Sequence, residues 1–405
     1  MINGADTAWL MVSSALVLMM MLPALGFFYA GLVQAKNILS VLFQTFAIAA
    51  IVSLMWFAFV YSEAFSGSGA WIGDLKAVFL QNLPRTAAHP GTSIPESVFV
   101  MFQMTFAIIT PGLIIGAYVE RIKFGAVLMF SALWLVLVYA PVCHWVWGGG
   151  YFAQLGAMDF AGGIVVHLTA GISALLAAAM LGPRHGFPHS VQPPHAPWMV
   201  MVGAAFLWVG WFGFNAGSAL KAGSDAGMTM LATHLAAATA TCVWIAIEWI
   251  KFGKPSLVGA VTGAVAGLAT ITPASGYVGP LGAVALGVCG GLVCYGAVLV
   301  VKRRWKVDDA LDVLGVHGVG GALGSLLVPF AAGLGVGGTA LARPVLAQFG
   351  VQIETVIVTG LWSAAATFLI ITLVKAVAGW RIDREQEIQG LDFSSHGETG
   401  YNMNG

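Results

Sequence analysis

Apolar runs long enough to cross a bilayer recur along this chain from Ala8 to Trp380. Short stretches that hold nearly all of the charged residues separate these runs. A helix needs about 20 mostly apolar residues to cross a membrane, whereas a β-barrel would need alternation and a turn roughly every ten residues. At 8% charged residues, the chain also lacks the charge of an ordinary soluble domain. The pattern therefore predicts an all-α polytopic membrane protein.

The positions of the runs predict about eleven transmembrane helices. The predicted spans are 8–32, 40–62, 95–117, 124–142, 160–182, 197–217, 227–250, 257–273, 277–301, 312–333 and 352–380. A transmembrane domain over 1–380 and a tail over 381–405 follow from these spans. The N-terminus has no Lys or Arg before the first run, so a cleaved signal peptide is not expected.

Lysine and arginine are divided unequally between the two sides that these spans define. One side holds Lys36, Arg121, Lys123, Arg184, Lys251, Lys254, Lys302, Arg303, Arg304, Lys306, Arg381 and Arg384. The other side holds Lys76, Arg85, Lys221 and Arg343. Because loops rich in Lys and Arg stay in the cytoplasm, the first side is predicted to be cytoplasmic. The N-terminus then lies outside and the C-terminal tail lies in the cytoplasm.

Short patterns recur in the same order in both halves of the chain. They are Phe-x-Ala-Gly at 28–31 and 214–217, Ile-Thr-Pro at 109–111 and 271–273, and an Asp eight residues before a His, at Asp159 with His167 and at Asp309 with His317. Repeats of five helices have opposite topology, as in many transporters. We therefore expect an inverted 5+5 repeat, with repeat one over about 8–182, repeat two over about 197–333, and one further helix over about 352–380.

The two Asp–His pairs are the residues that most strongly indicate function. Each Asp is expected at the start of its helix, where a carboxylate can cap free amide groups. A rise of ~1.5 Å per residue places His167 and His317 ~12 Å deeper, near the membrane midplane, from opposite faces. Histidine at that depth normally faces a bundle interior or a wet cavity and is functional. The alternative is a hydrogen-bonded pair that only locks two helices together.

Aromatic residues and one hydroxyl gather near the predicted outer helix ends. They are Phe106, Trp147, Trp211, Phe212, Phe214 and Ser218. Aromatic faces attract cations, and a hydroxyl oxygen can accept a hydrogen bond from a cationic donor. Composition alone favours a different interpretation, an interfacial belt that anchors helices against lipid headgroups. His234 has no counterpart in the other half, so a packing role is expected for it.

The sequence lacks the motifs of nucleotide-binding proteins, metalloproteins and hydrolases. Gly318–Gly324 resembles a dinucleotide loop, but it lies within a span and no strand precedes it. No Walker lysine, metal-spaced ligand set or Ser/His/Asp order is present, so we expect neither an enzyme nor a metal or other cofactor. The net charge of zero gives no electrostatic reason to expect nucleic acid as a partner. An intramembrane haem protein with His167 and His317 as ligands is a further alternative, and it predicts a Soret band.

Long stretches of the chain resemble the ammonium transporter family, which includes the methylammonium permeases and the Rh proteins. The matching stretches are Phe102–Phe124, Val146–Gly150, Asp159–His167, Trp208–Ser218, Ile271–Val278, Asp312–Gly318 and Gly390–Tyr401. The resemblance is closer to the bacterial ammonium transporters than to the Rh proteins, chiefly through VWGGG, WFGFNAGS and the tail. It implies a homotrimer in the cell (inner or plasma) membrane, with one pore per subunit for ammonium or ammonia, and with methylammonium as an analogue.

The resemblance also implies roles for the residues near the outer face. Trp147 and Ser218 match the family's outer recruitment site, and Phe106 lies beneath it. Phe106 and Phe214 resemble the stacked rings that close the pore. Asp159 matches an essential aspartate near the same site. On this basis the aromatic residues form a cation site in preference to an interfacial belt.

Deeper in the membrane, His167 and His317 match the family's twin histidines. A dry pore makes an isolated ion costly, so ammonium is expected to release its proton and to cross as ammonia, with or without a separately relayed proton. Thr272 falls in the pore-facing segment of the eighth span in the family. Asp309 and Asp312 are the counterparts in the second repeat, and structural roles are expected for them.

The tail over 381–405 resembles a cytoplasmic segment that couples subunits and that supports regulation by a PII-type signalling protein in many bacterial members. The alternative for this segment is a frayed polar terminus. Some family members are fused to signalling modules, so an ammonium sensor is the alternative function. Only about 25 residues follow the last predicted span, too few for a folded signalling domain, which favours transport.

Overall fold

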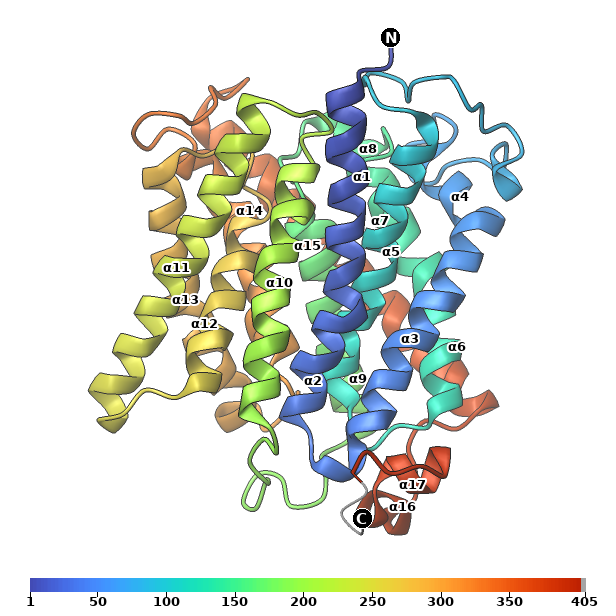
Figure 1. Ribbon diagram of the computed structural model, residues 1–405, viewed down its shortest axis with the longest axis vertical. Coiled ribbons are helices and arrows are strands. Elements are labelled where there is room, and N and C mark those ends of the chain that lie inside the picture. Colours follow the sequence, from blue (N-terminus) through green and yellow to red (C-terminus); the bar gives the residue numbers. More distant parts are fainter. Residues whose placement is uncertain (402–405) are drawn as a thin grey trace.

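The computed structural model describes residues 1–401, and no β-strand occurs within that range. Figure 1 shows long helices packed side by side, most of them running along the longest axis of the molecule. Helix α1 (Gly4–Met19) begins at one end of the bundle, and the short helices α16 (Arg384–Gln389) and α17 (Leu391–His396) lie at the other. These ends are called the upper and the lower end, as they are seen in Figure 1.

The remaining α-helices follow in chain order. In the first half they are α2 (Gly26–Leu32), α3 (Ile38–Met55), α4 (Tyr61–Phe65), α5 (Glu96–Tyr118), α6 (Phe124–Trp134), α7 (Ala140–Val146), α8 (Tyr151–Leu155) and α9 (Thr169–Leu181). In the second half they are α10 (Pro197–Gly217), α11 (Ser224–Phe252), α12 (Leu257–Ile271), α13 (Pro280–Leu299), α14 (Val319–Ala331) and α15 (Val345–Val377). π-helical turns at Met20–Leu25, Trp56–Val60, Leu135–Tyr139, Gly163–Leu168, Val300–Arg304 and Leu314–Gly318 join or extend several of them, and 3₁₀ turns occur at Ala35–Asn37 and Val78–Leu80.

Within residues 1–401, ten continuous helices are long and apolar enough to cross a membrane. They are Gly4–Leu32, Ala35–Phe65, Glu96–Tyr118, Phe124–Leu155, Gly163–Leu181, Pro197–Gly217, Ser224–Phe252, Pro280–Arg304, Leu314–Ala331 and Val345–Val377. Helix α12 is a shorter apolar helix at the position of the predicted span 257–273. The all-helical membrane class is therefore confirmed, and a total of eleven spans follows only if α12 also crosses.

Two predicted spans differ most from the structure at one end. The fourth continues past 142, because the π-helical turn at Leu135–Tyr139 leads directly into α7, and α8 extends it to Leu155 after a short turn. The last begins at Val345 instead of 352, and the polar residue in the added segment, Gln348, is buried with a partner. The Gln348 side chain donates to Gly156 O at 3.0 Å. Paired in this way, a glutamine can lie inside an apolar helix.

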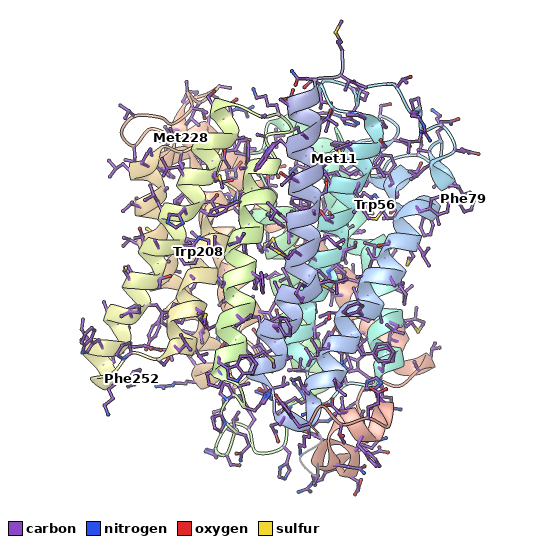
Figure 2. All side chains as sticks on the ribbon, viewed as in Figure 1. Met11, Trp56, Phe79, Trp208, Met228 and Phe252 are labelled. Carbon is purple, nitrogen blue, oxygen red and sulfur yellow. The ribbon has the colours of Figure 1, made fainter. Side chains whose placement is uncertain are left out.

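Apolar side chains also cover the outside of the bundle. Met11 and Phe252 are 59% and 62% exposed, and both project from the ribbon in Figure 2. Exposed apolar residues occur on α3, α11, α13 and α15 as well. A soluble protein would not tolerate so much apolar surface, whereas a bilayer covers it.

The two helices that carry His167 and His317, Gly163–Leu181 and Leu314–Ala331, approach each other closely at glycine residues. A Cβ atom on Gly171 would lie 2.2 Å from Gly318 Cα, so any side chain there would force the helices apart. The run Gly318–Gly324, which resembles a nucleotide loop in sequence, lies within the second of these helices. Its glycines let two membrane helices pack at close range.

Buried charges join the helix ends at the lower end of the bundle. Arg121 is fully buried and donates to Asp308 O at 2.6 Å and to Gly182 O at 2.8 Å. Arg184 pairs with Asp308 at 2.8 Å and with Glu120 at 2.9 Å. Burial alone would raise the pKa of Asp308, but the hydrogen bonds and charge of Arg184 hold that pKa below its ordinary value. These ion pairs fix the loops around the lower cavity described below.

The tail is folded against the same end, as far as the structure describes it. Asp392 at the start of α17 accepts hydrogen bonds from Ser40 N at 2.8 Å and from Leu39 N at 3.1 Å. Leu391 N donates to Asn37 Oδ1 at 2.8 Å. The alternative interpretation, a frayed terminus, therefore does not hold for α16 and α17. The end of the predicted tail, 402–405, lies outside the described residues.

Candidate functional site

Most of the site residues predicted from the sequence line three cavities that follow one another through the bundle. An upper cavity of about 390 Å³ has Phe106, Trp147 and Ser218 in its wall. A lower cavity of about 430 Å³ has His317 in its wall. A central cavity of about 10 Å³ lies between them, and both His167 and His317 line it. A space of that size holds about one water-sized molecule.

The upper cavity brings together the three residues predicted to recruit a cation. The rings of Phe106 and Trp147 meet edge to face, with their centroids 5.7 Å apart. Ser218 Oγ donates to Phe214 O at 2.8 Å, so its oxygen still has lone pairs that can accept. Trp147 Nε1 donates to Asp159 O at 2.9 Å, which fixes the plane of the indole. An aromatic face and a hydroxyl oxygen are thus available to a small cation.

Asp159 takes a different position from that of the other upper residues. Its carboxylate accepts hydrogen bonds from the backbone amides of residues 162, 163, 164 and 165 at 2.7–3.1 Å, and it is 4% exposed. It does not line the upper cavity. Burial raises the pKa of this carboxyl, and the four amide hydrogen bonds oppose that rise. The expected helix cap is present, although the helix itself begins later, at Gly163.

Two phenyl rings in contact lie between the upper cavity and the central one. The centroids of Phe106 and Phe214 are 4.2 Å apart at an interplanar angle of 33°, and each residue is 1% exposed. Phe106 lines the upper cavity, whereas Phe214 lines the central cavity. The tilted pair therefore lies at the boundary between the two spaces.

His167 and His317 meet in the middle of the bundle, one from each half of the chain. Their Nδ1 atoms are 3.2 Å apart and their rings are nearly parallel, at 21°. Two neutral imidazoles can share one Nδ1–H between them, which leaves one Nε2 with a lone pair and the other with an N–H. His167 Nε2 is buried without a hydrogen-bonding partner among the described residues. The direct contact leaves no gap for a haem plane between the rings.

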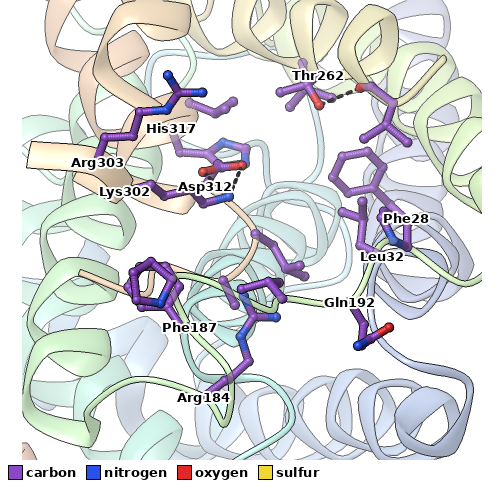
Figure 3. A pocket seen from close by; sticks show the side chains of 18 residues that line it. Phe28, Leu32, Arg184, Phe187, Gln192, Thr262, Lys302, Arg303, Asp312 and His317 are labelled. Carbon is purple, nitrogen blue, oxygen red and sulfur yellow. Dashed lines mark hydrogen bonds and ion pairs between the residues drawn. The ribbon is translucent and has the colours of Figure 1, made fainter. Parts of the chain in front are cut away.

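The lower cavity contains the charged residues of the second repeat (Figure 3). Lys302 and Asp312 form an ion pair at 2.8 Å in its wall, close to His317 in the picture. Asp309 is fully buried behind them and accepts from Leu314 N at 2.8 Å. Burial and the charge of Asp312 raise the pKa of Asp309 to about 6. Asp309 therefore caps its helix as Asp159 does, with fewer amide donors.

Thr272 and Trp211 form a support behind the histidines. Trp211 Nε1 donates to Thr272 Oγ1 at 2.8 Å, and Thr272 Oγ1 donates to Leu268 O at 2.7 Å. Trp211 in turn stacks on His167, with the centroids 5.4 Å apart. The structure thus places Thr272 behind Trp211, outside the walls of the three cavities.

Phe28 also lies at this site, although the sequence did not single it out as a site residue. Phe28 lines both the central and the lower cavity, on the opposite side of the histidines from Phe214. The signal was present, because Phe28 and Phe214 occupy the same position of the repeated Phe-x-Ala-Gly pattern. Phe212 and His234, by contrast, lie near each other, with centroids 6.2 Å apart, and neither lines any of these cavities.

Comparison with known proteins gives consistent matches. The sequence profile of the Ammonium Transporter Family matches residues 8–401. A putative ammonium transporter of Methanothermobacter thermautotrophicus is 44% identical over the whole of both chains. Among solved structures, one titled Sensor Amt Protein superposes with a TM-score of 0.90 at 30% identity, covering 97% of this chain and 98% of that one. Mep2 of Saccharomyces cerevisiae gives 0.86 at 32% identity, covering 95% and 88%.

Proposed function

Because the chain belongs to the ammonium transporter family, we propose that it carries ammonium across the cell membrane through the three cavities described above. The observation that supports this path is the imidazole pair, which lies between two larger cavities and behind two closed phenyl rings. Ammonium is captured in the upper cavity, loses its proton, passes the histidines as ammonia and leaves through the lower cavity.

Capture depends on the aromatic residues and the hydroxyl of the upper cavity. A desolvated cation–π contact with Trp147 or Phe106 stabilises ammonium by up to ~2 kcal/mol, and Ser218 Oγ can accept one N–H. A sodium or potassium ion would meet the same rings. It has no proton to release, so it would have to enter the central cavity as a charge. The dehydration that this requires costs many kcal/mol and excludes the ion.

Passage depends on the match between ammonia and the histidine pair. Ammonia has one lone pair and three N–H groups, and the two Nε2 atoms together offer a lone pair and an N–H. The apolar walls of the central cavity, which include Met20, Leu25 and Val265, hold no fixed charge. A neutral molecule of about the size of water therefore crosses there at much lower cost than an ion.

The upper end faces the outside in this proposal. Basic residues predicted to be cytoplasmic, among them Arg184, Lys302 and Arg303, line the lower cavity. We also propose the inverted 5+5 repeat, with α12 counted as a span, since His167 and His317 reach one point from capped helix starts beside opposite cavities. A homotrimer, and control by a PII-type protein at the lower end, complete the proposal on the basis of family membership.

Transport can be tested with purified protein in liposomes or on a solid-supported membrane. An inward ammonium step should raise the internal pH when ammonia enters alone, or should give a current when the proton follows it. A potassium step of the same size should give neither signal. Protein-containing liposomes that respond to ammonium like empty liposomes would contradict the proposal.

Sensing is the second candidate function, because a solved structure titled Sensor Amt Protein superposes on the described chain with a TM-score of 0.90. The two functions differ in one measurement. A sensor binds ammonium with saturable affinity without accelerating its flux, whereas a transporter does both. Saturable binding without flux in the liposome assay would therefore favour sensing.

Replacing the recruitment residues is expected to weaken capture. In the double variant Trp147→Ala with Ser218→Ala, the apparent affinity for ammonium and methylammonium should fall by about tenfold or more, since a cation–π contact and a hydrogen-bond acceptor are both lost. The measurement is the concentration dependence of flux at equal expression. Trp362→Ala, which removes an exposed indole outside the path, is the matched control. An unchanged concentration dependence in the double variant would indicate that Trp147 and Ser218 anchor the helix ends at the membrane interface and do not capture the cation.

Detaching the tail is expected to reduce activity without dissociating the oligomer. Asp392→Ala removes the acceptor for two amides at the start of α3, and truncation after Trp380 removes the whole segment. We expect both variants to lower flux, with the truncation having the larger effect, while the size of the detergent-solubilised particle stays the same. Glu398→Ala, a substitution beyond α17, is the control for Asp392→Ala. A fully active truncated protein would show that the tail does not couple to the pore.

A further inference from the structure

The upper cavity contains one ionisable side chain, and the family resemblance did not draw attention to it. Among the described residues that line this cavity, which include Phe102, Gln103 and Leu220, only His89 has an ionisable side chain with a lone pair that can accept a proton. The Asp159 carboxylate lies outside the wall and is already occupied by four amides. If ammonium loses its proton in the upper cavity, His89 is the acceptor that the wall of this cavity provides.

The loop that carries His89 is held firmly in place. His89 N donates to Ile94 O at 2.9 Å, and Thr92 N and Thr92 Oγ1 both donate to His89 O, at 3.0 and 2.9 Å. The imidazole lies flat on the ring of Phe99, with centroids 3.5 Å apart and an interplanar angle of 10°. Phe99 also lines the cavity. The ring of His89 therefore has a fixed plane at the cavity wall.

Glu96, the first residue of α5, sets the tautomer of His89. His89 Nδ1 lies 2.7 Å from Glu96 Oε2, and both side chains are less than a fifth exposed. Since an ionised carboxylate only accepts hydrogen bonds, the proton of a neutral His89 lies on Nδ1 and the lone pair lies on Nε2. Tyr61 donates to the other carboxylate oxygen and fixes Glu96 in turn. No hydrogen bond to a described residue occupies His89 Nε2.

We propose that His89, oriented by Glu96, accepts the proton of ammonium in the upper cavity. This inference rests on the proposed function and adds the group that carries out its first chemical step. An N–H bond of ammonium breaks, its electron pair stays on nitrogen, and the proton forms a bond with His89 Nε2. Ammonia moves on towards Phe106, and the imidazolium, stabilised by the Glu96 carboxylate, returns its proton to water at the upper face.

The ionisable groups near His89 are few. Glu96 is in contact with it, and Tyr61 follows through Glu96. Asp6 accepts from Ser93 of the same loop. Glu96 is thus the carboxylate that directly contacts the imidazole of His89.

The test compares the concentration dependence of ammonium flux in liposomes for wild type and the variants. Removing a proton acceptor typically costs about 10²-fold or more, so His89→Gln should lower the maximal flux by at least about tenfold. Its apparent affinity should stay close to wild type, because Trp147 and Ser218 are intact. Glu96→Gln keeps the shape of the pair but removes the charge that stabilises the imidazolium, so its maximal flux should also fall while its apparent affinity stays the same. His234→Gln, outside the path, should match wild type.

The outcomes separate this inference from the proposed function. If wild type carries ammonium and His89→Gln has the same maximal flux, His89 is not the acceptor, and the transport proposal stands. A loss of flux in His89→Gln with wild-type maximal flux in Glu96→Gln, or with a weakened apparent affinity in either variant, would make both residues structural and would also overturn the inference. If wild type does not carry ammonium, the proposed function fails, and this inference fails with it.

Discussion

Asp159→Ala is expected to lower ammonium flux by about 100-fold or more, although the protein still assembles in the membrane. The carboxylate accepts four backbone amides at the start of the first histidine helix. An unsatisfied buried amide costs about 1–3 kcal/mol, so the segment 160–165 must rearrange to find other partners. The carbonyl of Asp159 also positions Trp147, and the segment 160–165 leads directly to His167. A single substitution therefore disturbs capture and passage together.

Two further variants make this prediction specific. Asp159→Asn keeps the volume but offers one acceptor oxygen and directs an NH₂ group at amide donors, so its flux should also be strongly reduced. Asp225→Ala removes an exposed carboxylate that pairs with Lys221 at the upper end, and it should leave flux within about twofold of wild type. Flux in proteoliposomes and oligomer size in detergent are the measurements. Asp159→Ala with normal flux would show that the cap is dispensable.

Replacing His167 and His317 is expected to change which species crosses. The alanine variants enlarge a central cavity of about 10 Å³, and the aspartate variants place a carboxylate in it. In both cases the cost of an ion inside the pore falls, because water or a countercharge can accompany it. Potassium conductance should therefore appear in the single variants, and most strongly with aspartate. Ammonium should then cross partly as the ion.

Paired recordings of ammonium and potassium test this prediction. Wild type and each variant are compared for current and for isotope flux, with both cations at the same concentration. The control is His195→Ala, at a histidine that lines none of the three cavities and whose Nδ1 lies 2.8 Å from Val33 O. If the double variant His167→Ala with His317→Ala keeps wild-type ammonium flux and current and still excludes potassium, the imidazole pair only holds two helices together.

Features that depend on helical periodicity could be predicted from the sequence. The spacing of the apolar runs predicted the ten long apolar helices, because a bilayer sets helix length. His167 and His317, predicted at matched depth, lie 3.2 Å apart at their Nδ1 atoms. Trp147, Phe106 and Ser218, grouped by the resemblance, line one cavity. These features depend on helix length and helix register.

The sequence could not reveal features that depend on loops and on irregular turns. The Asp159 carboxylate bonds amides up to Val165, instead of standing free beside the recruitment residues, because the backbone turns before Gly163. Likewise, no local pattern indicates that the loop 87–96 brings His89 to the cavity. The sequence also could not show that the tail is folded against the bundle, because this contact depends on backbone amides at the start of α3.

Both histidines lie in π-helical turns, Gly163–Leu168 and Leu314–Gly318, and this ties their meeting to chain length as well as to residue type. A π-helical turn holds one residue more than the α-helical turn in which it is embedded, and one residue of α-helix corresponds to ~100° of rotation and ~1.5 Å of rise. Deleting a single codon between Gly162 and His167 would let the turn relax to α-helix. With the Asp159 cap held in place, His167 and α9 would then be rotated by ~100° relative to that cap. The imidazole would turn with the helix, away from the direction in which it now meets His317. In these two short segments, a gain or loss of one residue is therefore a more severe change than most exchanges of side chain.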